Sequence, residues 1–325
     1  MRHSARLSLL FTCLLASTAI AKEPQKQLVI ISFDGAHDNA LWEKSRQMAK
    51  DSGAHFTYFL SCTFYMTKDR AHAYQAPGEK RGRSNVGFAP DNADIAARLD
   101  NVWNAHLEGH EIASHACGHF DGSKWSKADW LEEFGTFRKT LLSAWDGIGK
   151  TAPDGWADFV TNDIRGFRAP YLAVSKTLPE AEKDAGYLFD ASLVTRGPAL
   201  PVMDGKLTRF GLPTIPEGPR DRRIIGMDYN LYVRHSDAKE DKRDAPQFEE
   251  RAYEAFKSAF DRQYDGDRIP LQLGFHFVEM NDGAYWRALD RLLQDVCHKD
   301  DVACVTYPEA MEILKKEKAE KSSAS

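Results

Sequence analysis

The chain is poor in several features that define whole classes of proteins. It has 5 cysteines in 325 residues, and its 43 Lys and Arg are outnumbered by 48 Asp and Glu, which gives a formal net charge of −5. Because nucleic-acid binding relies on clustered positive charge, we expect no nucleic-acid partner. Beyond residue 21, no apolar run approaches the roughly 20 residues of a membrane-spanning helix, so we expect no membrane span.

The amino-terminal segment has the pattern of a secretory signal peptide. Arg2 and Arg6 form a basic region, Leu9 to Leu15 a mostly apolar core, and Ala19 to Ala21 a small-residue cleavage site. This apolar core is too short to span a membrane. We therefore predict that residues 1–21 are removed and that the mature chain is exported, to the periplasm or the extracellular space.

Export determines how the cysteines are interpreted. If Cys13 leaves with the signal peptide, four cysteines remain, an even number in an oxidising compartment, and we expect two disulfides. Of the three possible pairings, the closeness of Cys297 to Cys304 across a polar segment favours that local bridge, which leaves Cys62 with Cys117. The alternative is that Cys117 is a zinc ligand. No lipid anchor is expected at Cys13, because the small residues of a lipoprotein site do not precede it.

The rest of the chain alternates between strand-like and helix-like segments. Hydrophobic residues make up 42% and aromatic residues 11% of the chain, which is ordinary for a globular protein. Apolar runs rich in β-branched residues predict strands, and apolar residues at helical spacing between capping signals predict helices. The expected strands are 27–33, 55–60, 111–113, 166–171, 187–193, 271–277 and 302–306. The expected helices are 39–52, 94–108, 126–145, 178–185, 248–264, 285–296 and 309–316.

Repeated strand and helix units in one continuous chain predict an α/β fold with a parallel sheet, either a barrel or an open sheet. No linker divides residues 22–314, so we expect a single domain and a monomer. Residues 315–325 are charged and are expected to form a frayed helix end followed by a disordered tail.

The segment SHACGH, residues 114–119, places His115 and His119 four residues apart just after the expected strand 111–113. Neutral imidazole is a common zinc ligand, and two histidines at this spacing can direct their ring nitrogens at one ion. The alternative is two ordinary polar histidines in a loop.

Other polar residues lie where expected strands end, which is where α/β folds gather their reactive groups. Asp34 ends the first strand, Arg168 and Tyr171 end the strand near 166, Asp190 lies in the following one, and His276 ends the strand near 271. Any one of these residues could be a mere boundary residue. Their repetition at the same topological position favours a site.

Together these segments resemble the five ordered motifs of the polysaccharide deacetylases, carbohydrate esterase family four with its NodB-homology domain. The segments GHEIASH (109–115) and RGFRAPY (165–171) are particularly similar to those of secreted animal chitin deacetylases. The similarity spans residue 27 to about residue 312. The five segments are FDG (33–35), GHEIASH (109–115) with His119, RGFRAPY (165–171), FDASL (189–193) and LGFH (273–276).

The resemblance implies a distorted (β/α) barrel, a divalent metal that is usually zinc, and hydrolysis of N-acetyl groups on aminosugars. Cobalt or another divalent ion is an alternative metal. The resemblance also implies a role for each residue: His115 and His119 as metal ligands, Asp34 as general base, Arg168 as the group that orients it, Asp190 as an acidic partner in that network, Tyr171 as the donor of an oxyanion-hole N–H, and His276 as general acid.

Two positions depart from the family pattern. The family's first motif carries two adjacent aspartates, the second a metal ligand, whereas this chain has Gly35 at the second position. The third ligand is therefore open: Asp34 is the leading candidate, and His37 or Asp38 from the following turn is the alternative. At the other position, Leu193 replaces the tryptophan that usually forms a packing wall.

The segment 65–91 is long for a loop, and it contains five basic residues together with Tyr74 and Phe88. It either lines a sugar groove, with its aromatic rings stacked on the glycan, or is a solvated insertion. Trp125 and Trp130 lie on either side of an expected helix start, where they border the cleft or act as packing groups.

The predicted function is removal of N-acetyl groups from a glycan, with chitin or chito-oligosaccharide as the expected substrate. The same site could instead hydrolyse O-acetyl esters on a polymer such as xylan, because both reactions pass through a tetrahedral intermediate. The substitution at Gly35 leaves a third possibility, a carbohydrate-binding pseudoenzyme.

Overall fold

The computed structural model describes residues 25–323, so the predicted signal peptide lies outside the described residues. The described strands are β1 Gln27–Asp34, β2 Thr57–Leu60, β3 Glu111–Ser114, β4 Gly166–Phe167, β5 Phe189–Thr195, β6 Val202–Asp204, β7 Leu207–Glu217, β8 Arg222–Ile225, β9 Leu271–His276 and β10 Val302–Cys304. The α-helices are α1 Asn39–Ser52, α2 Asn92–Leu107, α3 Lys127–Leu142, α4 Ala144–Gly147, α5 Trp156–Asp158, α6 Leu178–Ala185, α7 Asp228–Ser236, α8 Ala245–Tyr264, α9 Ala284–Val296 and α10 Tyr307–Ser323.

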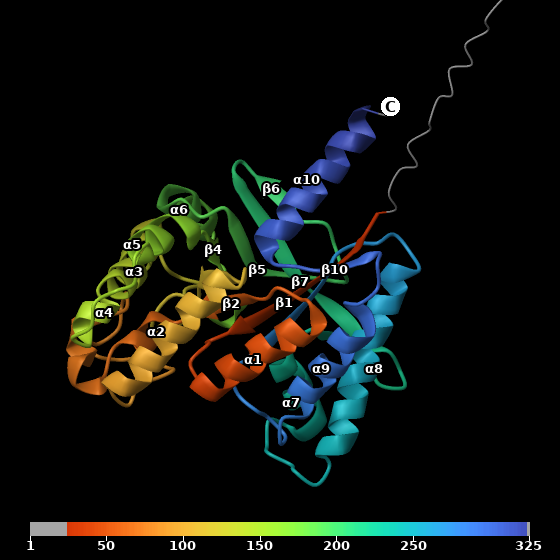
Figure 1. The fold of residues 1–325 in the computed structure, drawn as a ribbon, viewed down its shortest axis with the longest axis horizontal. Helices are drawn as coiled ribbons and strands as arrows, with labels where there is room; N and C mark the ends of the chain where they lie inside the picture. Colours follow the sequence, from red (N-terminus) through yellow and green to blue (C-terminus); the bar gives the residue numbers. More distant parts are fainter. Residues whose placement is uncertain (1–24, 324–325) are drawn as a thin grey trace, which may run out of the picture.

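Most of the sheet is parallel, in the order β10-β1-β2-β3-β4-β5-β7-β6, with β9 paired to β1 and β8 to β7. All eight residues of β1 are buried, which explains its continuous apolar sequence. β1 lies between β9 on one side and both β2 and β10 on the other (Figure 1). It is therefore the central strand.

The sheet curls so that its two ends approach each other. The segment after β8 returns to β9, where Met227 forms an isolated bridge with Gly274 and the Gly274 N–H donates to the carbonyl of Gly226. A Cβ at Gly274 would lie 2.7 Å from the end of the Met227 side chain, so glycine leaves room for this methionine beside β9. The curled sheet is thus closed at this point by a single β-bridge rather than by a continuous series of strand hydrogen bonds. This confirms the predicted distorted barrel.

Helices pack against the sheet and against each other around an aromatic core (Figure 1). The ring of Phe33 in β1 lies 5.5 Å from that of Tyr58 in β2 and 5.0 Å from that of Trp286 in α9. Such ring contacts add packing energy to the apolar area that they bury. The helix predicted at 39–52 has the same bounds as α1, with Asp38 as its amino-terminal cap and Gly53 in the left-handed conformation at its end.

The segment 196–236 departs most from the sequence prediction. No strand or helix was expected there, yet it contains β6, β7, β8 and α7. Pro213 and Pro216 lie within β7 and lack the N–H that a central strand donates, which disguised an 11-residue strand. β6 and β8 both pair antiparallel with β7, so this part of the sheet is not built from βα units.

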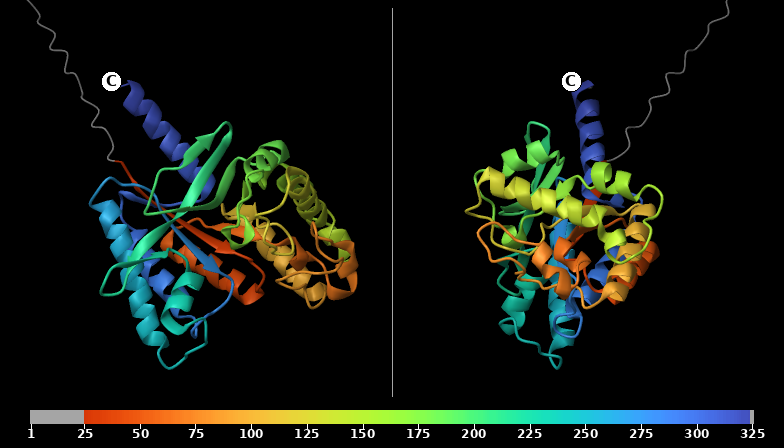
Figure 2. Two further views of the ribbon diagram at one scale, coloured as in Figure 1. Left: turned by 180° about the vertical axis from the view of Figure 1, so that it is seen from behind. Right: turned by 90° about the vertical axis from the view of Figure 1, so that its left-hand side faces the viewer.

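The carboxyl-terminal helix is also longer than predicted. α10 continues to Ser323, so most of the tail expected to be disordered is helical. The repeated Glu and Lys residues of that segment are good helix formers, which explains the extension. α10 projects from the body of the molecule in all three views (Figure 2).

Both predicted disulfides are confirmed. Cys62 is bonded to Cys117, and Cys297 to Cys304. The alternative of Cys117 as a zinc ligand is therefore wrong. Of the helices between residues 25 and 323, none combines the length and the apolar composition that crossing a membrane requires.

Candidate active site

The carboxyl ends of parallel strands bring most of the predicted residues together. Asp34, the last residue of β1, is paired in register with His276, the last residue of β9. On the other side of β1, the last residue of β2 pairs with Ser114 at the end of β3, directly before His115. The sheet itself thus places a carboxylate among three histidines.

Arg168 connects these strand ends. Its Nη1 donates to Asp34 Oδ1 at 2.7 Å and to Ser32 Oγ at 2.9 Å, and its Nη2 donates to the Tyr307 hydroxyl at 2.8 Å. The guanidinium also lies over the ring of Phe59, 4.3 Å from its centroid. Both charged groups of the Asp34–Arg168 pair are buried, so each needs the other, and the predicted orienting role of Arg168 has a direct geometric basis.

Burial alone would raise the pKa of Asp34, but the nearby charge of Arg168, together with that of His276, holds it below its ordinary value. The carboxylate therefore remains ionised at neutral pH. A low pKa suits a metal ligand well, whereas it makes a weak general base. With Oδ1 held by Arg168, Oδ2 is the oxygen that remains for another role.

His115 is oriented for metal binding. Its Nδ1 lies 2.7 Å from the carbonyl oxygen of Arg168. A carbonyl only accepts, so Nδ1 carries the proton and the neutral ring presents its Nε2 lone pair. Burial lowers the pKa of His115, and burial together with the His115 charge lowers the pKa of His119 to about 3. Both rings are thus neutral at physiological pH, with their centroids 5.0 Å apart.

The loop that carries these histidines has an unusual backbone. Ala116 and His119 adopt left-handed conformations with φ of 58° and 55°, and Tyr171 does so across the site with φ of 59°. Such conformations cost a non-glycine residue on the order of 1–2 kcal/mol and are often found at functional sites. Tyr171 is 60% exposed, and the centroid of its ring lies 4.5 Å from that of the His119 ring.

The third histidine, His276, has a partner that the sequence did not reveal. Asp228, the first residue of α7, accepts from His276 Nδ1 at 2.7 Å and from the His276 backbone N–H at 2.8 Å. Burial opposes the charged imidazole, but the Asp228 carboxylate outweighs it and raises the pKa of His276 above the ordinary value. Asp228 was missed because α7 was not predicted. Its only sequence signal is an aspartate followed by an aromatic residue, Tyr229.

The predicted fourth motif lies in β5, where Asp190 pairs in register with Phe167, the residue directly before Arg168. Asp190 pairs with Arg209 at 3.0 Å and accepts from the Ser192 N–H, so its direct partners are not Asp34 or His276. Its neighbour Leu193 in β5 is half-buried. Tyr229, 49% exposed, has its ring 5.9 Å from that of His276. Burial opposes the charge of Arg168, but the charge of Asp34 and also that of Asp190 raise its pKa. The role of Asp190 in the Asp34–Arg168 network therefore stays a prediction, whereas Asp228 and Tyr229 are neighbours of His276.

The donors fit a divalent metal in type: two neutral imidazoles and one carboxylate. In the part of the chain that the structure describes, however, no three His, Cys, Asp or Glu side chains form a ready-made cluster for an ion. The alternative ligands are engaged elsewhere. Asp38 accepts from the Leu41 N–H at the start of α1, and His37 Nδ1 pairs with the Gly35 carbonyl while its ring stacks on Phe64. Asp34 thus remains the leading candidate.

The aromatic residues considered for a sugar groove are mostly packing groups. Tyr74 and Trp130 are fully buried, Phe88 is half-buried against the core, and Trp125 packs against Trp130 with ring centroids 4.6 Å apart. The segment 65–91 is not a freely solvated insertion either. Its Asn85 side chain donates to the His119 carbonyl, and its backbone N–H to that of Gly118.

No model of a known protein family matches the sequence. A Bombyx mori protein named Chitin deacetylase 1 is 26% identical over 244 residues, which cover 65% of this chain and 41% of that protein. Together with the motif order, this similarity supports the resemblance to the polysaccharide deacetylases.

Solved structures of polysaccharide deacetylases share the fold. A protein from Mycobacterium smegmatis that is assigned to these enzymes aligns with a TM-score of 0.57 at 16% identity, over 92% of this chain and 94% of its own. A second, from Pseudomonas aeruginosa, aligns with a TM-score of 0.51 at 13% identity, over 90% and 92%. The chain spans less than half the length of the Bombyx mori relative, so the activity of that whole protein does not transfer to it directly.

Proposed function

We propose that this polysaccharide deacetylase relative is a metal-dependent hydrolase that removes N-acetyl groups from an aminosugar glycan, chitin or a chito-oligosaccharide. The supporting observation is the convergence of three units at one edge of the sheet: the Asp34–Arg168 pair, the His115–His119 pair and the His276–Asp228 pair. An isolated glycan-binding surface has no use for a buried ionised carboxylate beside neutral imidazoles and a histidine with a raised pKa.

His115, His119 and Asp34 would hold the metal, zinc in first place. When bound, a divalent ion polarises a carbonyl and lowers the pKa of water from ~16 towards ~7. His115 is already fixed in the required tautomer by the Arg168 carbonyl. Asp34 supplies the negative charge, and Arg168 prevents its carboxylate from rotating away.

The remaining groups serve proton transfer and charge stabilisation. With Asp34 as metal ligand, its role as general base is shared or displaced, because its other oxygen is held by Arg168 and its low pKa makes it a weak base. His276, whose charged form Asp228 stabilises, can donate a proton to the departing amine. The N–H of Tyr171 is proposed as a donor to the developing oxyanion, where loss of one donor costs about 3 kcal/mol.

One assay tests this function against its two alternatives. Acetate release is measured from N-acetylated chito-oligosaccharides and from acetylated xylan, with chelator and after addition of zinc or cobalt. We expect chelator-sensitive release from the chito-oligosaccharides. Release from xylan alone would instead make the protein an O-acetyl esterase. Metal binding without acetate release from either substrate would show a carbohydrate-binding pseudoenzyme.

We also propose that the protein works after export, in the periplasm or outside the cell. The two disulfides support this location, because thiols in reducing compartments rarely stay oxidised. Fractionation of the producing cells, with an antibody against the mature chain, tests it. Recovery of the full-length chain in the cytoplasm alone would contradict it.

A further inference from the structure

The loop between the two histidines is held by hydrogen bonds at every backbone polar group from Ala116 to Gly118. Three of these bonds are local or come from the backbone of neighbouring segments. The other three use side chains of residues more distant in the sequence: Thr63 donates to the Cys117 carbonyl, while Glu133 in α3 and Tyr74 in the segment that follows β2 accept from the two amides.

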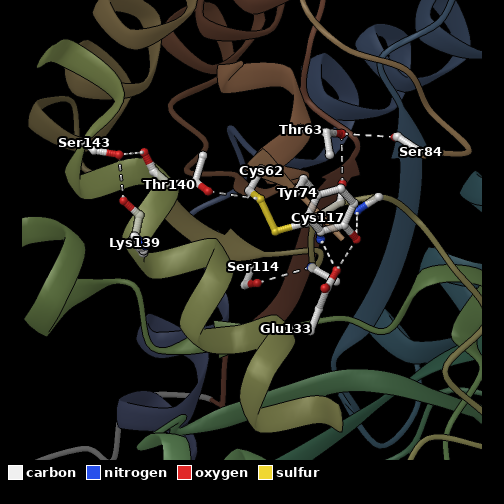
Figure 3. Close-up of a disulfide and its surroundings, with 12 residues drawn as sticks. Cys62, Thr63, Tyr74, Ser84, Ser114, Cys117, Glu133, Lys139, Thr140 and Ser143 are labelled. Atoms are coloured by element: carbon white, nitrogen blue, oxygen red, sulfur yellow. Dashed lines mark hydrogen bonds between the residues drawn. A yellow bond between two sulfur atoms is a disulfide. The ribbon is translucent and has the colours of Figure 1, made fainter. Parts of the chain in front are cut away.

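Glu133 and Tyr74 form one continuous unit with the loop. Glu133 Oε1 accepts from the Cys117 N–H and from the Tyr74 hydroxyl, each at 2.9 Å, and the Tyr74 oxygen accepts from the Gly118 N–H at 2.9 Å. Figure 3 shows the Glu133 carboxylate meeting both the Cys117 backbone and the Tyr74 hydroxyl. A Cβ at Gly118 would lie 2.7 Å from the Tyr74 ring and hydroxyl, so the tyrosine packs directly on this backbone.

Burying Glu133 and Tyr74 beside the loop costs free energy, which favours a role for these side chains beyond packing. Glu133 is 1% and Tyr74 0% exposed, and the second carboxyl oxygen of Glu133 has no hydrogen-bond partner among the described residues. Burial raises the pKa of Glu133 to about 7. An unsatisfied buried carboxyl oxygen costs on the order of 1–3 kcal/mol, and an apolar residue at this position in the core would avoid that cost.

We infer that Glu133 and Tyr74 are positioning residues for the metal site. They fix the amides of Cys117 and Gly118, and thereby hold the strained loop in the shape that presents His115 and His119 on the same side as Asp34. The inference rests on the proposed function for its metal, while the anchoring itself is independent of it. Neither residue belongs to the five motifs of the resemblance.

The experiment compares Tyr74→Phe, Glu133→Leu and Glu133→Gln with the wild type. Zinc affinity is measured by competition with a chromophoric chelator, and hydrogen exchange of the Cys117 and Gly118 amides is measured by NMR on metal-free protein. We expect Tyr74→Phe and Glu133→Leu to bind zinc ~10–100-fold more weakly, as is typical when the support of a ligand is lost. Both should exchange these two amides at least ~10-fold faster.

Glu133→Gln separates hydrogen bonding from charge. Its amide oxygen can still accept from the Cys117 N–H and the Tyr74 hydroxyl, so zinc affinity and exchange rates should stay close to those of the wild type. The matched control is Tyr65→Phe. Tyr65 is also buried, and its hydroxyl has no partner among the described residues, so its removal should leave both measurements unchanged.

Wild-type zinc affinity in both Tyr74→Phe and Glu133→Leu would overturn the inference, and so would unchanged exchange at both amides. If Glu133→Leu does not fold, Tyr74→Phe alone decides, because it removes one oxygen and keeps the ring. If the wild type binds no zinc, the proposed function fails, and the exchange rates by themselves decide whether the two side chains anchor the loop.

Discussion

Asp228 controls the charge of His276, the proposed general acid. Its carboxylate contacts the imidazole of His276 at 2.7 Å and raises the pKa of that ring. The charged form of His276 is therefore present to higher pH than in an ordinary histidine. A general acid of this kind contributes about 10²–10⁴-fold to a rate.

We predict that Asp228→Asn lowers the pKa of His276. The alkaline limb of the pH–rate profile should then move to lower pH, and the rate at pH 7 should fall by ~10-fold or more. Asp237→Asn is the matched control, since Asp237 is exposed just after the same helix, α7. In a His276→Ala background, Asp228→Asn should have no further effect on the rate. An unchanged alkaline limb would contradict the pairing.

Gly35 gives a second prediction at the level of one residue. It has a φ of +63°, and a Cβ built on it meets nothing within 4 Å. Aspartate tolerates this left-handed conformation better than most residues. Gly35→Asp should therefore add a carboxylate beside Asp34 and bind zinc at least ~10-fold more tightly than Gly35→Ala, which introduces the same backbone strain without a ligand. Equal zinc affinities of the two variants would show that the added carboxylate does not reach the ion.

At the scale of elements, the disulfide between Cys62 and Cys117 joins the end of β2 to the histidine loop, whereas the one between Cys297 and Cys304 joins α9 to β10. The first closes a loop of 55 residues and the second one of 7. The chain-entropy model gives about 4 kcal/mol for the first and about 2–3 kcal/mol for the second.

We predict that Cys62→Ala/Cys117→Ala lowers both the free energy of unfolding and the zinc affinity. Cys297→Ala/Cys304→Ala should lower the free energy of unfolding only, because that bridge is remote from the histidines. Urea denaturation and chelator competition on the two double variants make the comparison. The same loss of zinc affinity in both would indicate a general loosening of the fold.

The strands and helices that could be predicted are those whose local sequence pattern matches their burial and their ends in the folded protein. β1 is buried on both faces, so its six apolar or small residues before Asp34 predict a strand directly, and α1 is bounded by two recognisable capping residues, Asp38 and Gly53. β7 and α7 lack this agreement. Prolines interrupt β7, and α7 begins after Met227 without a side-chain cap, so its position depends on the bridge to Gly274.

The same distinction applies to the site. Asp34, His115, Arg168 and His276 follow recognisable strands and could be predicted in their places. Asp228 lies 48 residues before His276, and Glu133 and Tyr74 reach the histidine loop from unrelated segments. Such contacts form only in the folded chain, and no local sequence pattern predicts them.

At the scale of the whole molecule, buried ionisable groups act on stability in opposite directions. Burial lowers the pKa of His110 to about 4, so between pH 6.5 and 4 the unfolded chain binds more protons and stability falls as the pH falls. Burial and the Asp190 charge raise the pKa of Glu182 well above its ordinary value. There the folded chain binds more protons, so stability falls as the pH rises above about 4.5.

We predict that these two contributions can be separated by mutation. Relative to the wild type, His110→Asn should gain on the order of 1–2 kcal/mol of unfolding free energy between pH 7 and pH 5, since its amide oxygen can accept the Phe56 N–H bond without titrating. Glu182→Gln should show the opposite trend and gain as the pH rises. Urea denaturation at pH 5, 6 and 7 measures both. Parallel pH profiles for the wild type and either variant would refute the corresponding contribution.

The hydroxyl of Tyr307 accepts a hydrogen bond from Arg168, and Tyr307 is the first residue of α10. The arginine that orients Asp34 therefore takes one of its supports from the final helix. During synthesis, Asp34, His115, His119 and Arg168 all emerge from the ribosome well before this support exists. The arrangement around Asp34 is therefore complete only when α10 has packed beside β1 and Arg168.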